Sequence, residues 1–327
     1  MKRIRAHFNK LARKIGKFVG IKIDCPFKVF GAQPSSAKII QKPLWIKIPA
    51  STPCYPSGHP NLGEKSQLFP GTWVWEAKNV RTFGPTIAVV DERNQLLAQV
   101  SIEWGRCPDE NWVFRRCRLP PTENLRGNSL IMASTGGDTY FHWMTDVMPK
   151  YFLAQKAGYG PKDFDHFIVN GTTRPFQKES LARLGIPLDK CRTFDDKEKN
   201  YLAERAVVPS LQGRPGVVSP RTVQQIRAAF PVFRGSKKRG SRIFIGRSGA
   251  ADRKLLHEKE IKSFLASAGF RIFEPANFSI SEQAALFSSA DLVVVAHGAA
   301  ATNLVFCRPG TRVIELFSPE YVNLGLS

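Results

Sequence analysis

Two side chains with acid–base chemistry stand four residues apart near the middle of the chain. His142 and Asp146 belong to a segment, 140–157, that is predicted to be helical, so both lie on one helical face. A carboxylate or an imidazole can remove a proton from a bound hydroxyl group. We assign the base to Asp146, with His142 orienting it or binding the molecule that supplies the hydroxyl, and the swapped assignment stays open. In the simpler interpretation Asp146 pairs with Lys150 and His142 is a half-buried structural side chain.

A histidine followed by small residues marks a second candidate site. The apolar run 291–295 predicts a buried parallel strand, and His297 and Gly298 come directly after it, before a helix predicted from residue 300. Open α/β sheets bind ligands at the carboxyl ends of their strands, and helix N-termini attract phosphate. The segment 297–303 therefore predicts a site for a phosphate-bearing ligand. A core histidine that ends a buried strand is the alternative.

Further charged residues lie near the ends of neighbouring predicted strands. Arg247 and Arg253 flank a glycine-containing strand-to-helix loop, a second predicted anion site, because a guanidinium group can bind phosphate through two hydrogen bonds. Solvated arginines are the alternative for these two. Glu315 interrupts the apolar strand predicted at 313–317, where an unpaired buried carboxylate is costly. Three interpretations of Glu315 are open: it binds a ligand hydroxyl, it pairs with Arg312, or it faces solvent.

The composition describes a basic globular chain. Its 327 residues carry a formal charge of +21, and such a field attracts polyanions or an anionic membrane face. Residues 1–20 have seven Lys or Arg, no acid and apolar residues at helical spacing, which predicts a basic amphipathic helix at a membrane surface. An ordinary surface helix or a tail is the alternative. No apolar run approaches the roughly 20 residues that cross a bilayer.

Cysteine and acidic motifs give no indication of a metal. The six cysteines are scattered without zinc-like spacing, which favours a reducing compartment. Asp163 and Asp165 form a DxD pattern, a pair of carboxylates that can bind a metal ion. Because the pattern precedes a predicted strand, we expect turn carboxylates there instead. The prediction is that no metal is required.

The last third of the chain alternates strands and helices, which predicts a parallel sheet with right-handed crossovers. Its helix at 279–290 begins with a capping box, Ser279 and Glu282. Residues 21–75 are predicted to be irregular, and a hairpin is predicted with strands at 86–91 and 97–104. The first half is expected to form a second βαβ-type layer. Predicted strands are 130–134, 166–170, 206–209, 242–245, 270–273, 292–295 and 312–317.

Two segments resemble glycosyltransferase family 61. The first, Tyr140-Phe-His-Trp-Met-Thr-Asp-Val-Met-Pro149, is similar to the Tyr/Phe-His-Trp-x-x-Asp-x-x-Pro signature of that family. The second runs from Arg247 to Glu315, with matching order and spacing. Its matching residues are Arg247-Ser248, Arg253, Glu258, Ser279, Glu282-Gln283, Leu286-Phe287, His297-Gly298-Ala299, Thr302-Asn303 and Val313-Ile314-Glu315. The resemblance covers about residues 130–317.

The resemblance implies an α/β, GT-B-like architecture, with two Rossmann-like domains facing a cleft. It implies an inverting, metal-independent glycosyltransferase that moves a sugar from a nucleotide-sugar donor to a glycan or lipid-linked acceptor in surface or capsular polysaccharide synthesis. The nucleotide sugar is a substrate, and no cofactor is expected. The predicted parts are a basic helix at 1–24, an acceptor-side domain at 25–218 and a donor-binding domain at 219–327. The expected location is cytoplasmic, peripheral on the inner membrane face through residues 1–20.

The resemblance also distributes roles among the candidate residues. Asp146 and His142 are the catalytic pair. Glu315 accepts hydroxyls of the donor ribose. The donor-binding residues are Arg247, Arg253, His297, Gly298, Ala299, Asn303 and Glu315.

The sequence departs from the family pattern at three places. Ala300 stands where a second glycine is usual, and His257 stands where an asparagine usually precedes the helix glutamate. Related two-domain transferases often finish with helices that cross back to the first domain, so an ending at Ser327 predicts a truncated second domain. An inactive truncated transferase and a non-enzymatic polyanion-binding protein are therefore the competing interpretations. Nucleic acid is not an expected partner, because no nucleic-acid-binding motif is found.

Overall fold

The computed structural model describes residues 28–30, 33–48, 50, 65–84, 86–116, 119–195, 199–232, 241–247 and 255–318. Three sequence predictions fall outside these residues. They are the basic helix at 1–24, the role of Arg253 and the end of the chain beyond residue 318.

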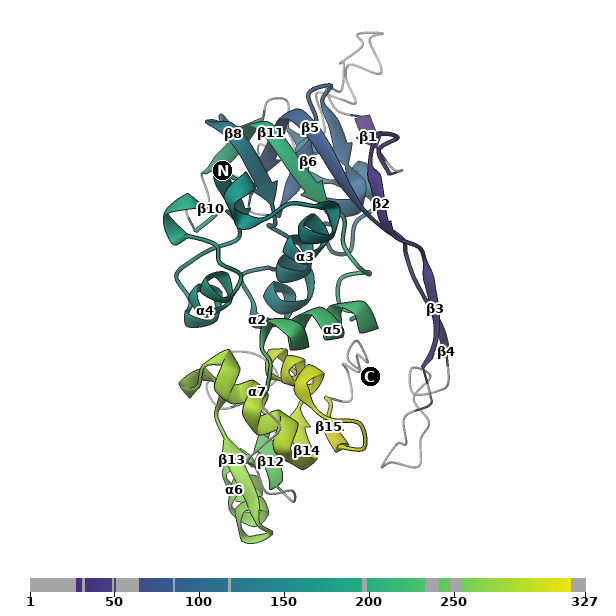
Figure 1. Cartoon of the computed structure of the whole chain (residues 1–327). Coiled ribbons are helices and arrows are strands. Elements are labelled where there is room, and N and C mark those ends of the chain that lie inside the picture. The colour runs from purple at the N-terminus through teal and green to yellow at the C-terminus, as the bar shows by residue number, and fades with distance from the viewer. Residues whose placement is uncertain are drawn as a thin grey trace.

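A large mixed sheet occupies the first half of the chain (Figure 1). Its order is β1-β7-β6-β5-β11-β8-β9-β10, and β2 pairs antiparallel with the first residues of β5. The long strands β5 and β11 pair antiparallel, whereas β11, β8, β9 and β10 are parallel neighbours. The bounds are β1 Lys28–Phe30, β2 Lys38–Gln41, β5 Thr72–Phe83, β6 Ala88–Val90, β7 Gln95–Leu97, β8 Glu123–Ile131, β9 His166–Val169, β10 Cys191–Thr193 and β11 Asn200–Pro209.

The prediction of a simple βαβ layer in this half is therefore wrong for part of the sheet. Parallel pairing holds for the four strands that follow residue 122. In contrast, β5 pairs antiparallel with β11 on one edge and with β6 on the other. A hairpin is confirmed, with strands 88–90 and 95–97, but the second strand predicted at 97–104 is wrong, because residues 98–100 form a 3₁₀ turn. Whether a strand pairs parallel or antiparallel depends on which distant segment lies beside it. The apolar pattern of the strand itself does not predict this.

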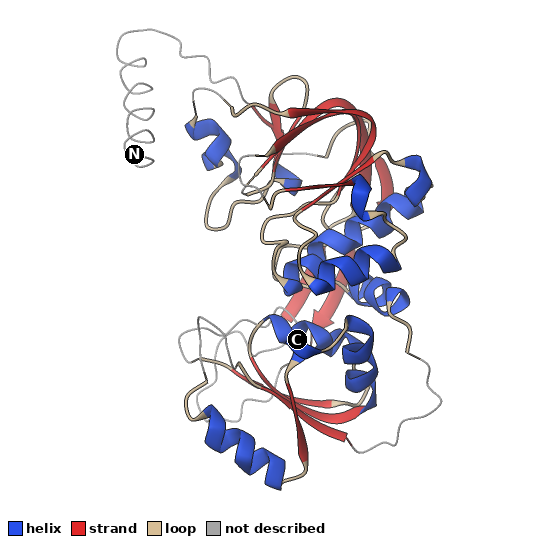
Figure 2. Ribbon diagram, turned by 90° about the vertical axis from the view of Figure 1, so that its left-hand side faces the viewer, coloured by secondary structure: helices blue, strands red, loops and turns tan. Residues whose placement is uncertain are grey.

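Helices lie between this sheet and a smaller one, as both Figure 1 and Figure 2 show. The segment predicted as one helix at 140–157 is helical throughout but contains a π-helical stretch, Trp143–Val147, between two α-helical pieces. Trp143, Met148 and Tyr151 are almost fully buried. The α-helices here are α2 Tyr140–His142, α3 Met148–Ala157, α4 Pro175–Arg183 and α5 Pro220–Ala229.

The smaller sheet confirms the prediction for the last third. Its order is β13-β12-β14-β15, and every pair is parallel. The capping box is also confirmed, because the Ser279 side chain accepts a bond from Glu282 N and Glu282 accepts one from Ser279 N. The bounds are β12 Ser241–Ile245, α6 Glu258–Ser267, β13 Phe270–Phe273, α7 Ile280–Ser289, β14 Ala290–Ala296, a 3₁₀ helix Ala299–Phe306 and β15 Arg312–Leu316.

One hydrophobic cluster runs through the helices into the smaller sheet. It includes Trp143 and Met148 from the middle layer, Ile226 from α5, and Ile243 and Val295 from the smaller sheet. A second cluster fills the other face of the large sheet. The boundary predicted at residues 218 and 219 stays a prediction, although α5 packs both on α3 and on the 3₁₀ helix.

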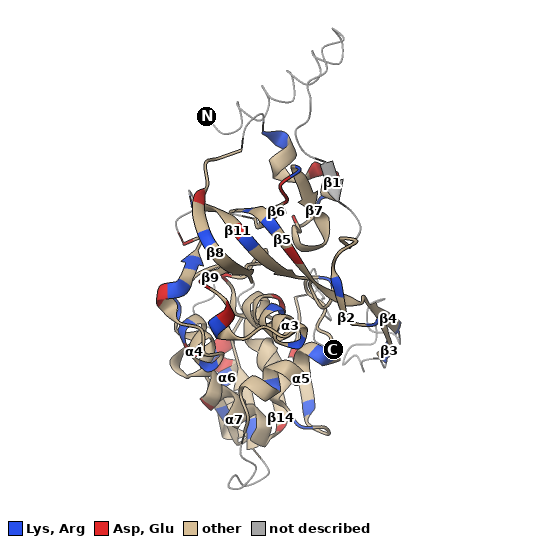
Figure 3. Ribbon diagram, turned by 45° about the horizontal axis from the view of Figure 1, so that its top comes forward, with Lys and Arg blue, Asp and Glu red and all other residues tan. Residues whose placement is uncertain are grey.

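The prediction that residues 21–75 are irregular is wrong for β1, β2, the start of β5 and a two-stranded ribbon. β3 Leu44–Ile48 and β4 Lys65–Phe69 pair antiparallel, and the ribbon extends beside the helices in Figure 1. The surrounding Pro, Gly and Ser residues conceal its short alternating pattern. Basic residues are found on many elements, including β2, β8, α4 and α5 (Figure 3). Within the described residues, no helix is long and apolar enough to cross a membrane.

Candidate active site

The predicted pair His142 and Asp146 is brought together on one helical face. The Nδ1 atom of His142 lies 2.6 Å from Oδ2 of Asp146, and their side chains are 16% and 11% exposed. The π-helical stretch begins directly after His142 and includes Asp146. A π-helical stretch inside an α-helix widens one turn of the helix, and such stretches occur often at functional sites. The pair is thus a partly buried imidazole–carboxylate couple of the kind that serves in proton transfer.

An indole that sequence reasoning missed lies against the imidazole. The Trp104 ring centre is 5.0 Å from that of His142 at an angle of 36°, and Phe141 meets the same imidazole edge-on at 5.0 Å. Gly136 makes this packing possible, since an added Cβ would lie 2.5 Å from the Trp104 ring and 2.9 Å from the His142 ring. The glycine pair before the helix, Gly136-Gly137, is the sequence signal that could have indicated a close approach here.

Lys150 does not form the direct ion pair that the simpler interpretation expects. Its Nζ is buried and donates a 2.6 Å hydrogen bond to the carbonyl of Ala133. Burial lowers the pKa of Lys150 to about 7, and the nearby Asp146 carboxylate opposes that shift. The closest partner of Asp146 is therefore His142, while Lys150 affects the carboxylate only through its charge.

The second predicted histidine forms a matching couple. Nδ1 of His297 lies 2.6 Å from Oε1 of Glu315, and the imidazole stacks on Phe317 with ring centres 4.8 Å apart. The pair forms because β14 and β15 are parallel neighbours, with the His297 N–H donating to Leu316 O at 2.9 Å. Glu315 thus contacts His297, whereas the sequence alternatives for it were Arg312, solvent or a ligand. A carboxylate on Nδ1 fixes the orientation and tautomer of the imidazole.

Arg247 and Gly298 meet at the same strand ends. Nη1 of Arg247 donates to the His297 carbonyl at 2.6 Å. A Cβ added to Gly298 would lie 1.8 Å from that Nη1, so only glycine leaves room for the guanidinium. The Arg247 backbone N–H donates to Oε1 of Glu258 at 2.9 Å. Ala299 starts the 3₁₀ helix, where its carbonyl accepts a bond from the Thr302 hydroxyl.

Asn303 joins the two candidate sites from the interior. It is fully buried, its Oδ1 accepts a 2.8 Å bond from the Tyr140 hydroxyl, and its Nδ2 donates to Gln283 Oε1 at 2.6 Å. Burial raises the pKa of Tyr140, with a contribution from the charge of Glu179. The predicted contact of Asn303 with a donor stays a prediction. Its observed contacts connect the helix of His142 with the 3₁₀ helix that follows His297.

Two further contacts hold the middle helices on the smaller sheet. The Glu179 carboxylate on α4 accepts bonds from Ile280 N at 2.6 Å and from Ser281 N at 3.0 Å, so it caps α7. The Arg227 guanidinium on α5 donates to the carbonyls of Val305 and Cys307. Both contacts place charged side chains on the ends of helices across the junction.

Asp163 in the DxD pattern is a turn carboxylate, as predicted, whereas Asp165 binds the backbone of the neighbouring strand β8. Asp163 accepts a 2.6 Å bond from Gly160 N, and Asp165 accepts a 2.8 Å bond from Asn128 N. In the part of the chain that the structure describes, no group of three or more His, Cys, Asp or Glu side chains is arranged to hold a metal ion.

Fold and site together define an α/β protein in which two histidine–carboxylate couples are connected through a buried tyrosine–asparagine contact. The sequence model of the family Glycosyltransferase 61 matches residues 140–314, more than half of the chain, and this span contains His142, Asp146 and His297 and ends one residue before Glu315. The chain belongs to the glycosyltransferase 61 family. A search of curated proteins found no match.

Proposed function

We propose that this protein is an inverting, metal-independent glycosyltransferase that moves a sugar from a nucleotide-sugar donor to a hydroxyl of a glycan or lipid-linked acceptor. Membership of the family supports transfer of a sugar. The observation that carries the mechanism is the 2.6 Å contact of His142 with Asp146, because inverting transfer needs a base for the acceptor hydroxyl. A GT-B-like pair of domains divided near residue 218 belongs to the same proposal.

In the proposed reaction the imidazole of His142 is the base, and Asp146 orients it. The carboxylate occupies Nδ1, which leaves Nε2 to take the acceptor proton, as in other carboxylate-supported histidine bases. This chooses the swapped assignment among the two that the sequence left open. The acceptor oxygen forms a bond to the anomeric carbon while the bond from that carbon to the phosphate oxygen breaks. The nucleoside diphosphate leaves with the bonding electron pair, and the configuration inverts.

The proposed donor site is built around the other couple. The His297 imidazole, the Arg247 guanidinium and the backbone after Gly298 stabilise the negative charge of the departing diphosphate. Glu315 orients His297, which replaces the ribose contact predicted from the sequence. These groups supply positive charge and hydrogen-bond donors without a metal ion, which supports metal independence. Addition of a chelator should therefore leave transfer unchanged.

Nucleotide-sugar binding combined with one substitution tests the proposal. Asp146→Asn should lower the turnover number by up to about 10,000-fold, because the base His142 then loses the carboxylate that orients it and fixes its tautomer. Donor affinity measured by calorimetry should be unchanged, because the residues proposed to bind the donor lie at the ends of β12 and β14 and not on the helix of Asp146. A panel of nucleotide sugars, screened by thermal shift, identifies the donor first. Salt-sensitive nucleic-acid binding without any nucleotide-sugar binding would instead favour a polyanion-binding protein.

The cellular setting is proposed on charge. Residues 1–20 are expected to hold the enzyme on the cytoplasmic face of an anionic membrane, where surface or capsular polysaccharide is made. Deletion of these residues should abolish flotation with liposomes containing an anionic lipid. Equal flotation of the shortened and the full chain would refute this assignment.

A further inference from the structure

Trp104 is a large apolar side chain that stays exposed beside the catalytic couple. It is 55% exposed, although one part of its ring contacts the imidazole of His142 and the backbone of Gly136. Burial of a tryptophan contributes strongly to stability. A tryptophan that is held in a fixed position and yet stays exposed is therefore a candidate for binding a ligand. The residue lies outside the span matched by the family, which begins at residue 140.

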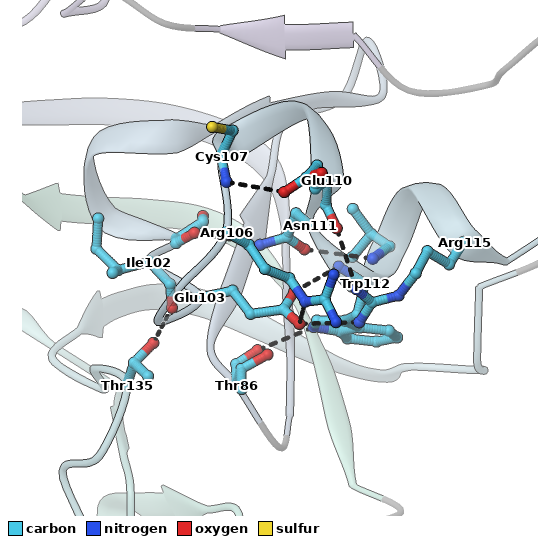
Figure 4. Close-up of polar contacts among 12 residues, drawn as sticks. Thr86, Ile102, Glu103, Arg106, Cys107, Glu110, Asn111, Trp112, Arg115 and Thr135 are labelled. Atoms are coloured by element: carbon cyan, nitrogen blue, oxygen red, sulfur yellow. Dashed lines mark hydrogen bonds and ion pairs between the residues drawn. The ribbon is translucent and has the colours of Figure 1, made fainter. Parts of the chain in front are cut away.

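A network of polar contacts fixes the loop that carries this indole (Figure 4). The Glu103 carboxylate accepts bonds from Arg106 Nε at 3.0 Å, Arg115 Nη2 at 2.8 Å and Trp112 N at 2.7 Å. On the other side, the hydroxyl of Thr135 donates to the carbonyl of Ile102. The residue preceding Trp104 is therefore held by three donors, and the loop is tied to the segment that leads into the helix of His142.

A rigid, exposed aromatic face beside a base for hydroxyl groups has the chemistry that recognises a sugar ring. The face of an indole carries partial negative charge, and the C–H groups on one side of a pyranose carry partial positive charge. The hydroxyl groups of such a ring then point outward from its edge. A sugar ring on the part of the Trp104 indole that His142 leaves uncovered would thus lie near the imidazole that is proposed to take the hydroxyl proton.

We infer that Trp104 is a stacking platform for the sugar ring of the acceptor, so that the acceptor presents a carbohydrate at the reacting end. This inference rests on the proposed function. The acceptor is a better candidate than the donor nucleotide for the molecule that stacks on Trp104, because the indole contacts His142, the proposed base. The residues proposed to bind the donor diphosphate lie elsewhere, at the ends of β12 and β14. An aromatic platform orders the acceptor with respect to the base, and Trp104 acts on binding and on orientation.

The test uses the full chain and simple sugars as probes. Methyl glycopyranosides of several configurations are titrated by saturation-transfer NMR, and the nucleotide-sugar panel is titrated by calorimetry. Trp104→Ala should weaken the best glycoside about 10-fold, equivalent to about 1.4 kcal/mol. Trp104→Phe should retain part of the affinity. Trp45→Ala, at an indole that is 68% exposed on β3, is the matched control and should change nothing.

The outcomes separate this inference from the proposed function. Donor affinity should stay within about twofold in Trp104→Ala, a change of less than about 0.5 kcal/mol. Loss of donor affinity in that variant would mean that the indole stacks on the nucleobase, and would overturn the inference. So would glycoside affinity equal to that of the wild type, or a wild type that binds no glycoside. Trp104-dependent glycoside binding without any nucleotide-sugar binding would uphold the platform and refute the transferase.

Discussion

The contact between Gly298 and Arg247 permits a sharp test of the donor site. In Gly298→Ala the new Cβ would lie 1.8 Å from Nη1 and 3.0 Å from Cζ of Arg247. Carbon and nitrogen atoms pack at about 3.5–4.0 Å, so the guanidinium must move by about 2 Å. The backbone accepts alanine, because the φ angle of 164° at Gly298 is extended. The effect of the substitution therefore comes from the displaced guanidinium.

The displaced guanidinium loses its 2.6 Å bond to the carbonyl of His297. Hydrogen bonds that involve a charged group contribute about 1.5–3 kcal/mol, and water recovers part of this at a half-buried site. We expect the free energy of unfolding to fall by about 1–2 kcal/mol. Donor affinity should fall by about 10-fold, because the cation no longer lies at the proposed diphosphate position.

Urea unfolding and calorimetry with the donor measure the two effects. Gly160→Ala is the matched control, because its added Cβ meets only Asp163 Oδ2, at 3.7 Å, and its φ is −112°. In an Arg247→Ala background, Gly298→Ala should add little, since the two substitutions act on one contact. Losses that simply add, in stability and in donor affinity, would refute the argument that Gly298 acts by making room for Arg247.

Three further predictions concern the helix of the catalytic couple. Because burial lowers the pKa of Lys150 from 10.5 to about 7, the unfolded chain binds more protons between these values, and stability should rise with pH there; in Lys150→Met, urea midpoints should lack this rise. Tyr140→Phe leaves the buried Oδ1 of Asn303 without its tyrosine partner and should cost about 1–3 kcal/mol in urea unfolding, whereas an unchanged midpoint would refute the importance of this contact. Gly136→Ala combines a φ of +75° with a clash against Trp104, so the near-ultraviolet circular dichroism of the indole should change and stability should fall by at least about 1 kcal/mol.

Local patterns in the sequence predicted the smaller sheet and the face of the catalytic helix. The four short runs predicted at 242–245, 270–273, 292–295 and 312–317 are parallel strands. The central strands β12 and β14 are largely buried, as their apolar runs indicate, whereas Val313 and Ile314 on the edge strand β15 are exposed. His142 and Asp146 meet because four residues make about one helical turn. The pairing of His297 with Glu315 joins residues that the sequence singled out separately.

Long-range contacts were beyond prediction from a single sequence. Tyr140 and Asn303 are 163 positions apart, and neither residue carries a local sign of its partner. Trp104 was overlooked because its significance depends on a loop that folds against Gly136. The antiparallel pairing of β5 with β11 also brings together distant segments, whose apolar patterns fit either strand direction.

The shared hydrophobic cluster has a consequence for the energetics of the whole molecule. Side chains of the middle helices, such as Trp143, belong to the same buried cluster as Val295 in the smaller sheet. Neither part therefore has a complete interior without the other, and separation would expose apolar surface on both. We expect a calorimetric scan to give a single cooperative heat-absorption peak, and either half expressed alone to aggregate.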